Sequence, residues 1–441
     1  MSNGQWVLGN ITYYKLPIAY LKLCTFARFL HKKLISKSIT LTTLRKIMDI
    51  NKNALDFSNT EIAFSNKSDK ELKKTAWLFR MMNNPHLVKY GSNLALKSVE
   101  WGLPFADTVI KNTIFQQFCG GTTLLNSSPT IEHLAKFKTQ SILDYGVEGK
   151  ETEEDFNKTM VENIRAIDFA SKSKHIPFVS IKITGLARFD LLQKIQDNAP
   201  MTMDEQTEYF SVSKRLDSIC HAGRDKGVGV LIDAEESWIQ DSIDRMANMM
   251  MARYNKEKAV VYNTFQMYRH DRLKFLKESF ELAKQKEYFL GAKLVRGAYM
   301  LKERNRAEEM GYSTPINPDK VATDKLYNDA LVFCVSNFEK IACMNATHNA
   351  QSSILLAELM EEMGIARDHS HFYFCQLLGM SDNITFNLSA AGYNVAKYIV
   401  YGSVKDVLPY LVRRAQENSS VTGDMSRELS LITKEVKRRG V

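Results

Sequence analysis

The 441-residue chain lacks several features that would assign it to a class at once. It has no run of about 18 uncharged apolar residues, so the sequence predicts no transmembrane helix. It has only 9 prolines and 25% charged residues, a composition typical of a globular protein rather than of a disordered or fibrous chain. Its six cysteines form no CxxC pair, which argues against a structural zinc site and favours a reducing compartment.

Common nucleotide and metal motifs are also missing. The glycines of GVGV at 227–230 precede a strand, and no third glycine follows, so they do not form a dinucleotide fingerprint. The chain contains neither GxxxxGK[ST] nor HExxH. The HSH sequence at 369–371 offers two histidines, but such a pair at a strand start is usually structural. The sequence therefore predicts no metal centre.

Acidic residues are absent from the first 47 positions, which carry eight basic ones, while the rest of the chain has a net charge of only +1. A nearly neutral body argues against nucleic-acid binding. Residues 1–47 form a basic leader with three interpretations. The first interpretation is a transit peptide, and the second is a helix that lies on a membrane surface. The third is an untranslated stretch upstream of a true start at Met48.

Residues 48–138 are predicted to form an N-terminal helical region. Ser68 and Glu71 have the spacing of a capping box, and apolar residues then recur at helical spacing. A second helix is expected near residues 87–101. The CGGTT sequence at 119–123 is interpreted as a break.

From residue 139 to 441 short apolar runs alternate with longer amphipathic segments. This rhythm predicts parallel strands connected by helices. Eight repeats in about 300 residues fit a (β/α)8 TIM-type barrel, an α/β fold. The eight runs are 142–146, 178–184, 228–235, 260–266, 292–297, 342–347, 371–378 and 395–402.

Polar residues gather where these strands end. Catalytic side chains of a barrel lie at the carboxyl ends of its strands. One such residue alone is more often a satisfied core group, but the whole set on one barrel face indicates a site. The set comprises Lys182, Asp233, Asn263, Gln266, Lys293, Arg296, Thr347, His348, Asn349, Gln376 and Tyr398.

A second group follows the eighth strand. Tyr410, Arg413, Arg414 and Glu417 share one helix face by their spacing. Two guanidinium groups at a barrel mouth suit a small carboxylate, which they bind through bidentate, charge-assisted bonds. Since no catalytic triad or glycosidase carboxylate pair is evident, a cofactor is expected to carry the chemistry.

The motifs GAKLVRGAY, MNATHN, FCQLLGM and YLVRRAQENSS, in this order, resemble those of the proline dehydrogenase family. The resemblance covers roughly residues 50–435, and VSIKITGL and VLIDAEE agree with it. It implies a distorted (β/α)8 barrel that binds FAD. The insertion after RGAY is similar to that of the branch containing the mitochondrial enzymes, and the length implies a monofunctional protein.

The resemblance also implies the substrate site. Arg413 and Arg414 match the pair that grips the proline carboxylate, and Lys182 supports that grip. Asp233 matches an active-site acid, which we interpret as orienting its partners. Tyr398 matches the aromatic residue beside the proline ring. The other pocket walls match Ala298, Tyr299 and Leu377.

The cofactor contacts follow from the same resemblance. Lys293 stands where many bacterial members carry an arginine near the flavin N5, which keeps the charge but loses the guanidinium fork. Glu417 is expected to pair with the arginine cluster and to belong to the cofactor side. The expected FAD contacts are Asn263, Lys293, Val295, Arg296, Gly297, Thr347, His348, Asn349, Gln376 and Glu417.

The implied reaction is oxidation of L-proline to Δ1-pyrroline-5-carboxylate by hydride transfer to FAD. The implied partners are a membrane quinone, reached by peripheral membrane contact, and a downstream pyrroline-5-carboxylate dehydrogenase. The expected location is the bacterial inner membrane on its cytoplasmic side. If the leader is a transit peptide, it is the mitochondrial inner membrane or matrix.

Three alternatives are weighed against this reading. The first is a trans-4-hydroxy-L-proline dehydrogenase of the same family, which Tyr398 disfavours because a ring hydroxyl would meet its bulky side chain. The second is a carboxylate-binding barrel without redox function. The third is a metal-dependent hydrolase that uses His348, His369 and His371.

Overall fold

The computed structural model describes residues 55–101, 103, 105–147, 149–420 and 424–441. The predictions about the basic leader and about Met48 as a start lie outside these residues. Residues 55–441 form one compact unit, in which the predicted helical region packs on the barrel.

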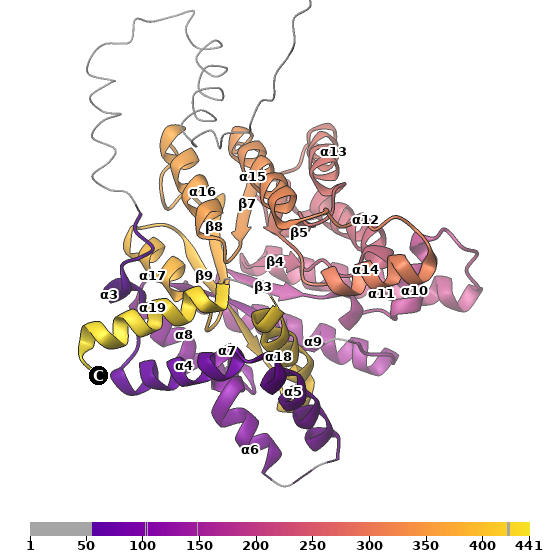
Figure 1. Cartoon of the computed structure of the whole chain (residues 1–441). Helices are drawn as coiled ribbons and strands as arrows, with labels where there is room; N and C mark the ends of the chain where they lie inside the picture. The colour runs from indigo at the N-terminus through magenta and orange to yellow at the C-terminus, as the bar shows by residue number, and fades with distance from the viewer. Residues whose placement is uncertain (1–54, 102, 104, 148, 421–423) are drawn as a thin grey trace, which may run out of the picture. The chain divides into compact units, whose positions relative to one another are not determined.

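Eight parallel strands pair in chain order, and the last of them, β9, pairs with both β8 and β2, so that the barrel closes (Figure 1). Each strand coincides with one of the eight predicted apolar runs, which confirms the predicted fold class. The strands are β2 (Gln140–Tyr145), β3 (Phe178–Ile181), β4 (Gly229–Ile232), β5 (Val261–Gln266), β6 (Leu290–Val295), β7 (Ile341–Ala346), β8 (Phe372–Leu377) and β9 (Val395–Tyr401).

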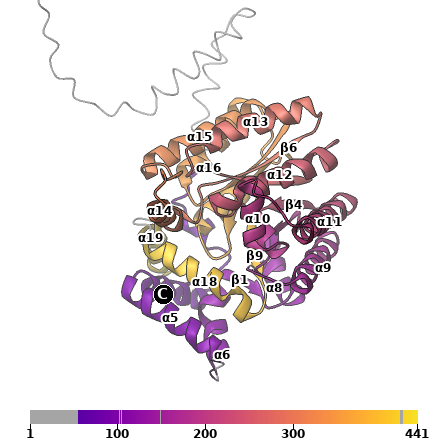
Figure 2. The same ribbon diagram turned by 90° about the vertical axis from the view of Figure 1, so that its right-hand side faces the viewer.

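Helices connect these strands and cover the outside of the barrel (Figure 2). Their apolar faces join the outward side chains of the strands in the largest core cluster. They are α9 (Glu153–Ala170), η3 (Ile183–Gly185), α10 (Phe189–Gln196), α11 (Met203–Lys226), α12 (Ser237–Tyr254), α13 (Arg272–Gln285), α14 (Met300–Met310), α15 (Lys320–Ser336), α16 (Ala350–Glu362) and α17 (Asp382–Ala390).

In the N-terminal helical region the capping box predicted for α4 is confirmed, because Ser68 and Glu71 bond reciprocally at the helix start. The predicted second helix is α5. The region consists of α3 (Thr60–Ala63), α4 (Asp69–Met82), α5 (Pro85–Glu100), α6 (Ala106–Ile110), η2 (Lys111–Phe115), α7 (Gln116–Phe118) and α8 (Leu124–Lys136).

The barrel is distorted where its last helix is expected. Helix α18 (Val404–Ser420) packs on α5 and α4 instead of covering β9 (Figure 2), and α19 (Asp424–Arg439) packs on α4. Helix α8 takes the vacated place beside β2 and β9. The last helix therefore packs on the N-terminal helical region and not on the outside of the strands.

The break predicted at 119–123 is instead a short strand, β1 (Cys119–Gly121), which pairs with the end of β9. Both positions require glycine because neighbouring atoms leave no room for a Cβ. A Cβ on Gly120 would lie 2.2 Å from the Ile399 side chain, and one on Gly121 would lie 2.6 Å from the backbone of Asn126. The strand thus continues the barrel wall beyond the end of β8.

The inside of the barrel is filled at its amino-terminal end by large apolar side chains. The ring of Phe178 makes edge contacts with Tyr262 and Tyr373. Ile142, Leu231, Met344, Cys375 and Tyr398 belong to the same interior cluster. This packing leaves the polar inward side chains at the carboxyl end, where a barrel places its chemistry.

Within the part of the chain described, no helix combines the length and apolarity that a bilayer span requires.

Candidate active site

Four charged side chains meet inside the barrel at its carboxyl end. Lys182 and Asp233 follow directly after β3 and β4, while Asp144 lies on β2 and Lys293 on β6. The Lys293 ammonium lies 2.5 Å from one oxygen of Asp233, and the Lys182 ammonium lies 3.8 Å from the other. Lys182 also lies 3.6 Å from Asp144. Residues from four strands thus form one ionic cluster.

Asp233 is the centre of this cluster. It accepts a further hydrogen bond of 2.7 Å from the hydroxyl of Ser180. Burial by itself would raise the pKa of Asp233, but the charges of Lys293 and Lys182 outweigh burial and hold the pKa below its ordinary value. Asp233 therefore remains a carboxylate at neutral pH and is suited to orient the two lysines.

Tyr398 on β9 closes one side of the cluster. The Lys293 ammonium lies 4.7 Å from the centre of its ring, a cation–π geometry. Burial, followed by the nearby charge of Asp233, raises the pKa of the Tyr398 hydroxyl well above its ordinary value. The ring therefore acts as a neutral wall.

The two arginines lie on α18, where they are half-buried. The Arg414 guanidinium lies 5.4 Å from the centre of the Tyr410 ring. The charge of Arg414 also contributes to lowering the pKa of His348. The side chain of Glu417, the fourth member of the predicted face, is outside the described residues.

The predicted pocket walls differ in burial. Ala298 is exposed and Tyr299 half-buried in the turn after β6. Leu377 ends β8 and packs on the interior cluster that contains Tyr398. Leu377 thus lies on the barrel interior, whereas Ala298 and Tyr299 lie in the turn that follows β6.

A second hydrogen-bonded group follows β6, β7 and β8. The Arg296 guanidinium donates to Asp324 at 2.8 Å, Thr347 at 2.6 Å and Ser352 at 3.0 Å, and it stacks on the Tyr327 ring. These contacts hold a cation at the barrel mouth in one orientation.

Two other predicted residues fix the backbone of the same turn. The amide of Gln376 donates to the carbonyl oxygen of Thr347 and accepts from Thr385. Asn349 caps α16 through its contact with the backbone N–H of Ser352. In the described structure their hydrogen bonds position the turn after β7.

His348 in the same turn is a neutral group. Its Nδ1 lies 2.9 Å from the hydroxyl of Ser381. Burial, together with the charges of Lys397, Arg414 and Arg296, lowers the pKa of His348 to about 3. A neutral imidazole can donate one hydrogen bond and accept another.

Asn263 points away from the barrel interior. Its amide donates to Asp244 on α12 at 2.8 Å, in the layer between the sheet and the helices. Gln266, three residues later, lies on the inner face: it donates to the carbonyl oxygen of Glu235, while its Oε1 is buried without a partner among the described residues. The geometry places Gln266, rather than Asn263, at the mouth.

Gly297 has a φ of 132°, which favours glycine, and a Cβ there would lie 2.5 Å from the Tyr268 ring. Val295, two residues earlier, ends β6 half-buried. The backbone of this turn is therefore packed closely against an aromatic ring.

The three histidines that a metal-dependent hydrolase would use lie at opposite ends of the barrel. His369 and His371 precede β8, whereas His348 follows β7. His371 lies 2.7 Å from the carbonyl oxygen of Phe338, and its ring packs on that of His369. The three do not form one ligand set, so this alternative is wrong.

The residues at the mouth fit a flavin. Among the described residues the buried Gln266 Oε1 has no hydrogen-bond donor, and a flavin ring N–H would supply one. Lys293 is a buried cation on the same face, and Arg296 is a half-buried cation fit for an anionic phosphate. Gln266 was not among the predicted cofactor contacts.

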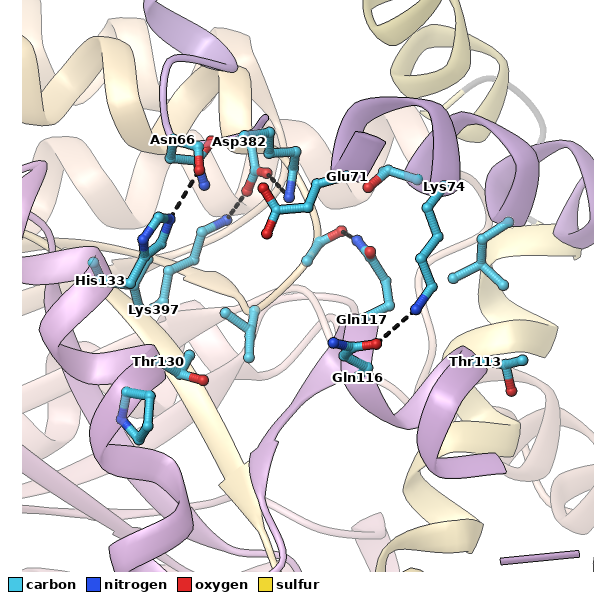
Figure 3. A pocket seen from close by; sticks show the side chains of 17 residues that line it. Asn66, Glu71, Lys74, Thr113, Gln116, Gln117, Thr130, His133, Asp382 and Lys397 are labelled. Carbon is cyan, nitrogen blue, oxygen red and sulfur yellow. Dashed lines mark hydrogen bonds and ion pairs between the residues drawn. The ribbon is translucent and has the colours of Figure 1, made fainter. Parts of the chain in front are cut away.

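A separate polar cavity of about 400 Å³ lies outside the barrel wall, between α4, α7, α8 and the turn after β8 (Figure 3). Lys397 on β9 and Lys67 both pair there with Asp382, at 2.9 and 3.4 Å. Across it, Lys74 donates to Gln116 at 2.6 Å. The Lys67–Asp382 pair joins the N-terminal region to the barrel.

Comparison with known proteins supports the resemblance. The model of the family described as Proline dehydrogenase matches residues 127–427, more than half of the chain. Proline dehydrogenase 1, mitochondrial, of Dictyostelium discoideum is 32% identical over 377 residues, 75% of this chain and 65% of that protein.

Two further relatives have different coverage. The Drosophila melanogaster protein of the same name is 40% identical over 245 residues, 53% of this chain and 36% of its own length. The chain therefore spans about a third of the Drosophila protein and about two thirds of the Dictyostelium protein. Hydroxyproline dehydrogenase of Xenopus laevis is 29% identical over 429 residues, 88% of this chain and 90% of that protein.

Among solved structures, the chain is similar in fold to a proline utilization A protein from Bdellovibrio bacteriovorus inactivated by N-propargylglycine. The TM-score is 0.67 at 19% identity, and the match covers 94% of this chain and 43% of that one. Together with the family match, these findings show that the chain belongs to the proline dehydrogenase family.

Proposed function

We propose that this protein oxidises L-proline to Δ1-pyrroline-5-carboxylate with FAD as its cofactor. The observation that carries the proposal is the convergence of Lys182 and Lys293 on Asp233, beside the ring of Tyr398. A cation-rich mouth against an aromatic wall suits a small ring that bears a carboxylate.

The substrate carboxylate binds to Arg413 and Arg414, with Lys182 adding a third positive charge. Guanidinium groups bind carboxylates in a bidentate geometry, which fixes the direction of the ring as well as its position. Tyr398 and Leu377 then bound the apolar edge of the ring.

The amine of proline must be neutral when the neighbouring C–H bond is broken. Positive charge around the site favours loss of the ammonium proton. The low pKa of Asp233 suits it for orienting Lys182 and Lys293 rather than for accepting this proton. Proton release to solvent is therefore expected.

When bound, FAD would supply the hydride acceptor, and a membrane quinone is the proposed oxidant of the reduced cofactor. Gln266, Lys293 and Arg296 are the residues that would hold it, with Gly297, Thr347, His348, Asn349 and Gln376 shaping the same turn. Val295 and Glu417 remain predicted contacts. Asn263 is not proposed as a contact, because its amide donates to Asp244 in the layer between the sheet and the helices.

The proposed partners follow from the reaction. A quinone acceptor implies contact with a bilayer, and the labile product implies a downstream pyrroline-5-carboxylate dehydrogenase. Homologues named mitochondrial support a mitochondrial inner-membrane or matrix location, while the cytoplasmic face of a bacterial inner membrane is the other expected site.

A second candidate is oxidation of 4-hydroxyproline, since the relative of that name is matched along 90% of its length. Tyr398 favours proline, because a ring hydroxyl would meet its buried side chain.

The visible spectrum of the purified protein, taken without oxygen, tests both candidates. Bleaching of a flavin spectrum by L-proline and not by 4-hydroxyproline supports the first. Bleaching by 4-hydroxyproline alone supports the second. A protein that stays colourless after FAD is supplied contradicts the flavin assignment.

A further inference from the structure

Helix α5 has two apolar faces, of which the described structure buries one. Val88 and Ser92 are buried, and Ala95 and Val99 pack partly on the cluster shared with α4 and α18. A helix that is apolar on more than its packed face presents the rest to another apolar phase.

The second face is a row of large side chains in solvent. Leu87, Tyr90, Leu94 and Trp101 stand at i, i+3, i+7 and i+14, so they form one stripe about 21 Å long. Their exposed fractions are 47%, 69%, 67% and 66%. We call these four residues the α5 stripe. Isolated exposed apolar residues are ordinary, but four large ones on one helix face mark an interaction surface.

The stripe continues past the end of the helix. Phe105 has a φ of 70°, an uncommon conformation for a bulky residue, and its ring is 80% exposed. Val109 on α6 is 61% exposed. Figure 1 shows α5 and α6 at the outer edge of the unit, away from the barrel strands.

The charges around the stripe are positive. Helices α4 and α5 carry six basic residues against three acidic ones. Two of the three acids are engaged within the fold, since Glu71 caps α4 and Asp69 pairs with Arg439 at 3.0 Å. Among the described residues no acid forms an ion pair with Lys89 or Lys97, both exposed on α5.

This charge selects the partner. A second copy of the surface would bring like charges together, and the segment 1–47 of the same chain holds eight cations and no acid. An anionic lipid surface is complementary to the lysines, and tryptophan and tyrosine favour the bilayer interface.

We propose that the α5 stripe is the membrane-contact surface and that it lies in the interface of a bilayer containing anionic lipid. The inference deepens the proposed function and rests on it for the choice of a membrane as partner. It assigns the contact to residues far from the ionic cluster of the barrel.

Sedimentation with vesicles tests the proposal, using the full chain and the chain starting at Met48, without proline. Both are expected to bind vesicles of equal phosphatidylcholine and phosphatidylglycerol, and to bind pure phosphatidylcholine more weakly. Leu94→Glu is expected to lower the partition coefficient about tenfold or more. Val321→Glu, which changes a residue 76% exposed on α15, is the matched control and leaves it unchanged.

Lys89→Glu and Lys97→Glu are each expected to lower binding to the anionic vesicles about fivefold. Binding by Leu94→Glu equal to that of the unchanged protein overturns the proposal. The proposal is also overturned if the unchanged protein does not bind vesicles, or if it forms a dimer that Leu94→Glu dissociates. Proline-dependent reduction of a soluble dye is measured separately: its absence alongside intact vesicle binding contradicts the proposed function and leaves the surface assignment standing.

Discussion

The ammonium of Lys293 lies 2.5 Å from a carboxylate oxygen of Asp233, so an ion pair joins β6 to the end of β4 across the inside of the barrel. Lys182 approaches the other oxygen of the same carboxylate. One acid therefore fixes two cations that the proposed reaction uses separately, one toward the substrate carboxylate and one toward the flavin.

Asp233→Asn is expected to lower kcat for proline by roughly a hundredfold, because small displacements of positioned groups have effects of this size. The flavin absorbance per chain is expected to remain. Steady-state kinetics with an artificial acceptor give kcat and KM separately. The control is Asp329→Asn, which removes an exposed i,i+4 pair with Lys325. An unchanged kcat in Asp233→Asn refutes the orienting role.

Arg413→Met is expected to raise KM for proline roughly tenfold to a hundredfold, since a charge-assisted hydrogen bond to a carboxylate contributes about 1.5–3 kcal/mol. Bound flavin is expected to be retained. Arg165→Met, on the exposed side of α9, serves as control. If KM stays the same, the carboxylate is held elsewhere.

Arg296→Met is expected to reduce the flavin content of the purified protein. The guanidinium is held by Asp324, Thr347 and Ser352, so its loss removes a fixed cation and loosens the turn after β7. The ratio of flavin to protein absorbance measures the effect, and Arg224→Met on α11 is the comparison. Full flavin content in Arg296→Met contradicts the assignment.

Glu235→Gln is expected to change how stability depends on pH. Glu235 accepts hydrogen bonds from the backbone and hydroxyl of Thr184, and burial raises its pKa to about 7 from an ordinary value of 4.5. Between pH 4.5 and about 7 the Glu235 carboxyl therefore stays protonated in the folded state, whereas in the unfolded state it loses its proton. Stability falls by up to about 3 kcal/mol as pH rises through this window.

In Glu235→Gln this side chain cannot ionise, so its contribution to stability does not fall with pH. The free energy of unfolding of the variant therefore rises relative to that of the unchanged protein as the pH is raised from 4.5 to 7. Urea unfolding at several pH values measures it, with Glu278→Gln, exposed on α13, as the reference. Parallel curves for the two proteins refute the assignment of the shift to Glu235.

The sequence predicted all eight barrel strands, because each is a short apolar run between helical segments, but it did not predict the direction of their side chains. Strands of a closed parallel barrel are apolar on both faces. Asn263 and Gln266, three residues apart on β5, necessarily point to opposite sides. Nothing in the run VYNTFQ distinguishes inside from outside, and the inner residue is Gln266.

The short strand β1 was missed for a different reason. Its three residues, Cys119, Gly120 and Gly121, include two glycines, which are rare in strands. They are there because Ile399 and Asn126 leave no room for a Cβ. Such a requirement comes from tertiary packing and is invisible in local sequence.

The pairing of β9 with β1, β2 and β8 also sets the order in which the protein can mature. Val400 pairs with Cys119 and Tyr398 with Ile142, so closure joins the two ends of the barrel sequence. Until β9 has been synthesised, β2 and β8 lack the strand that joins them, so the wall around Lys182, Asp233 and Lys293 cannot close. The ionic cluster is enclosed only after β9 leaves the ribosome, and α18 arrives later still. The carboxyl end of the barrel is therefore completed only when translation is nearly finished, and long-range closure of this kind is slow compared with local helix formation.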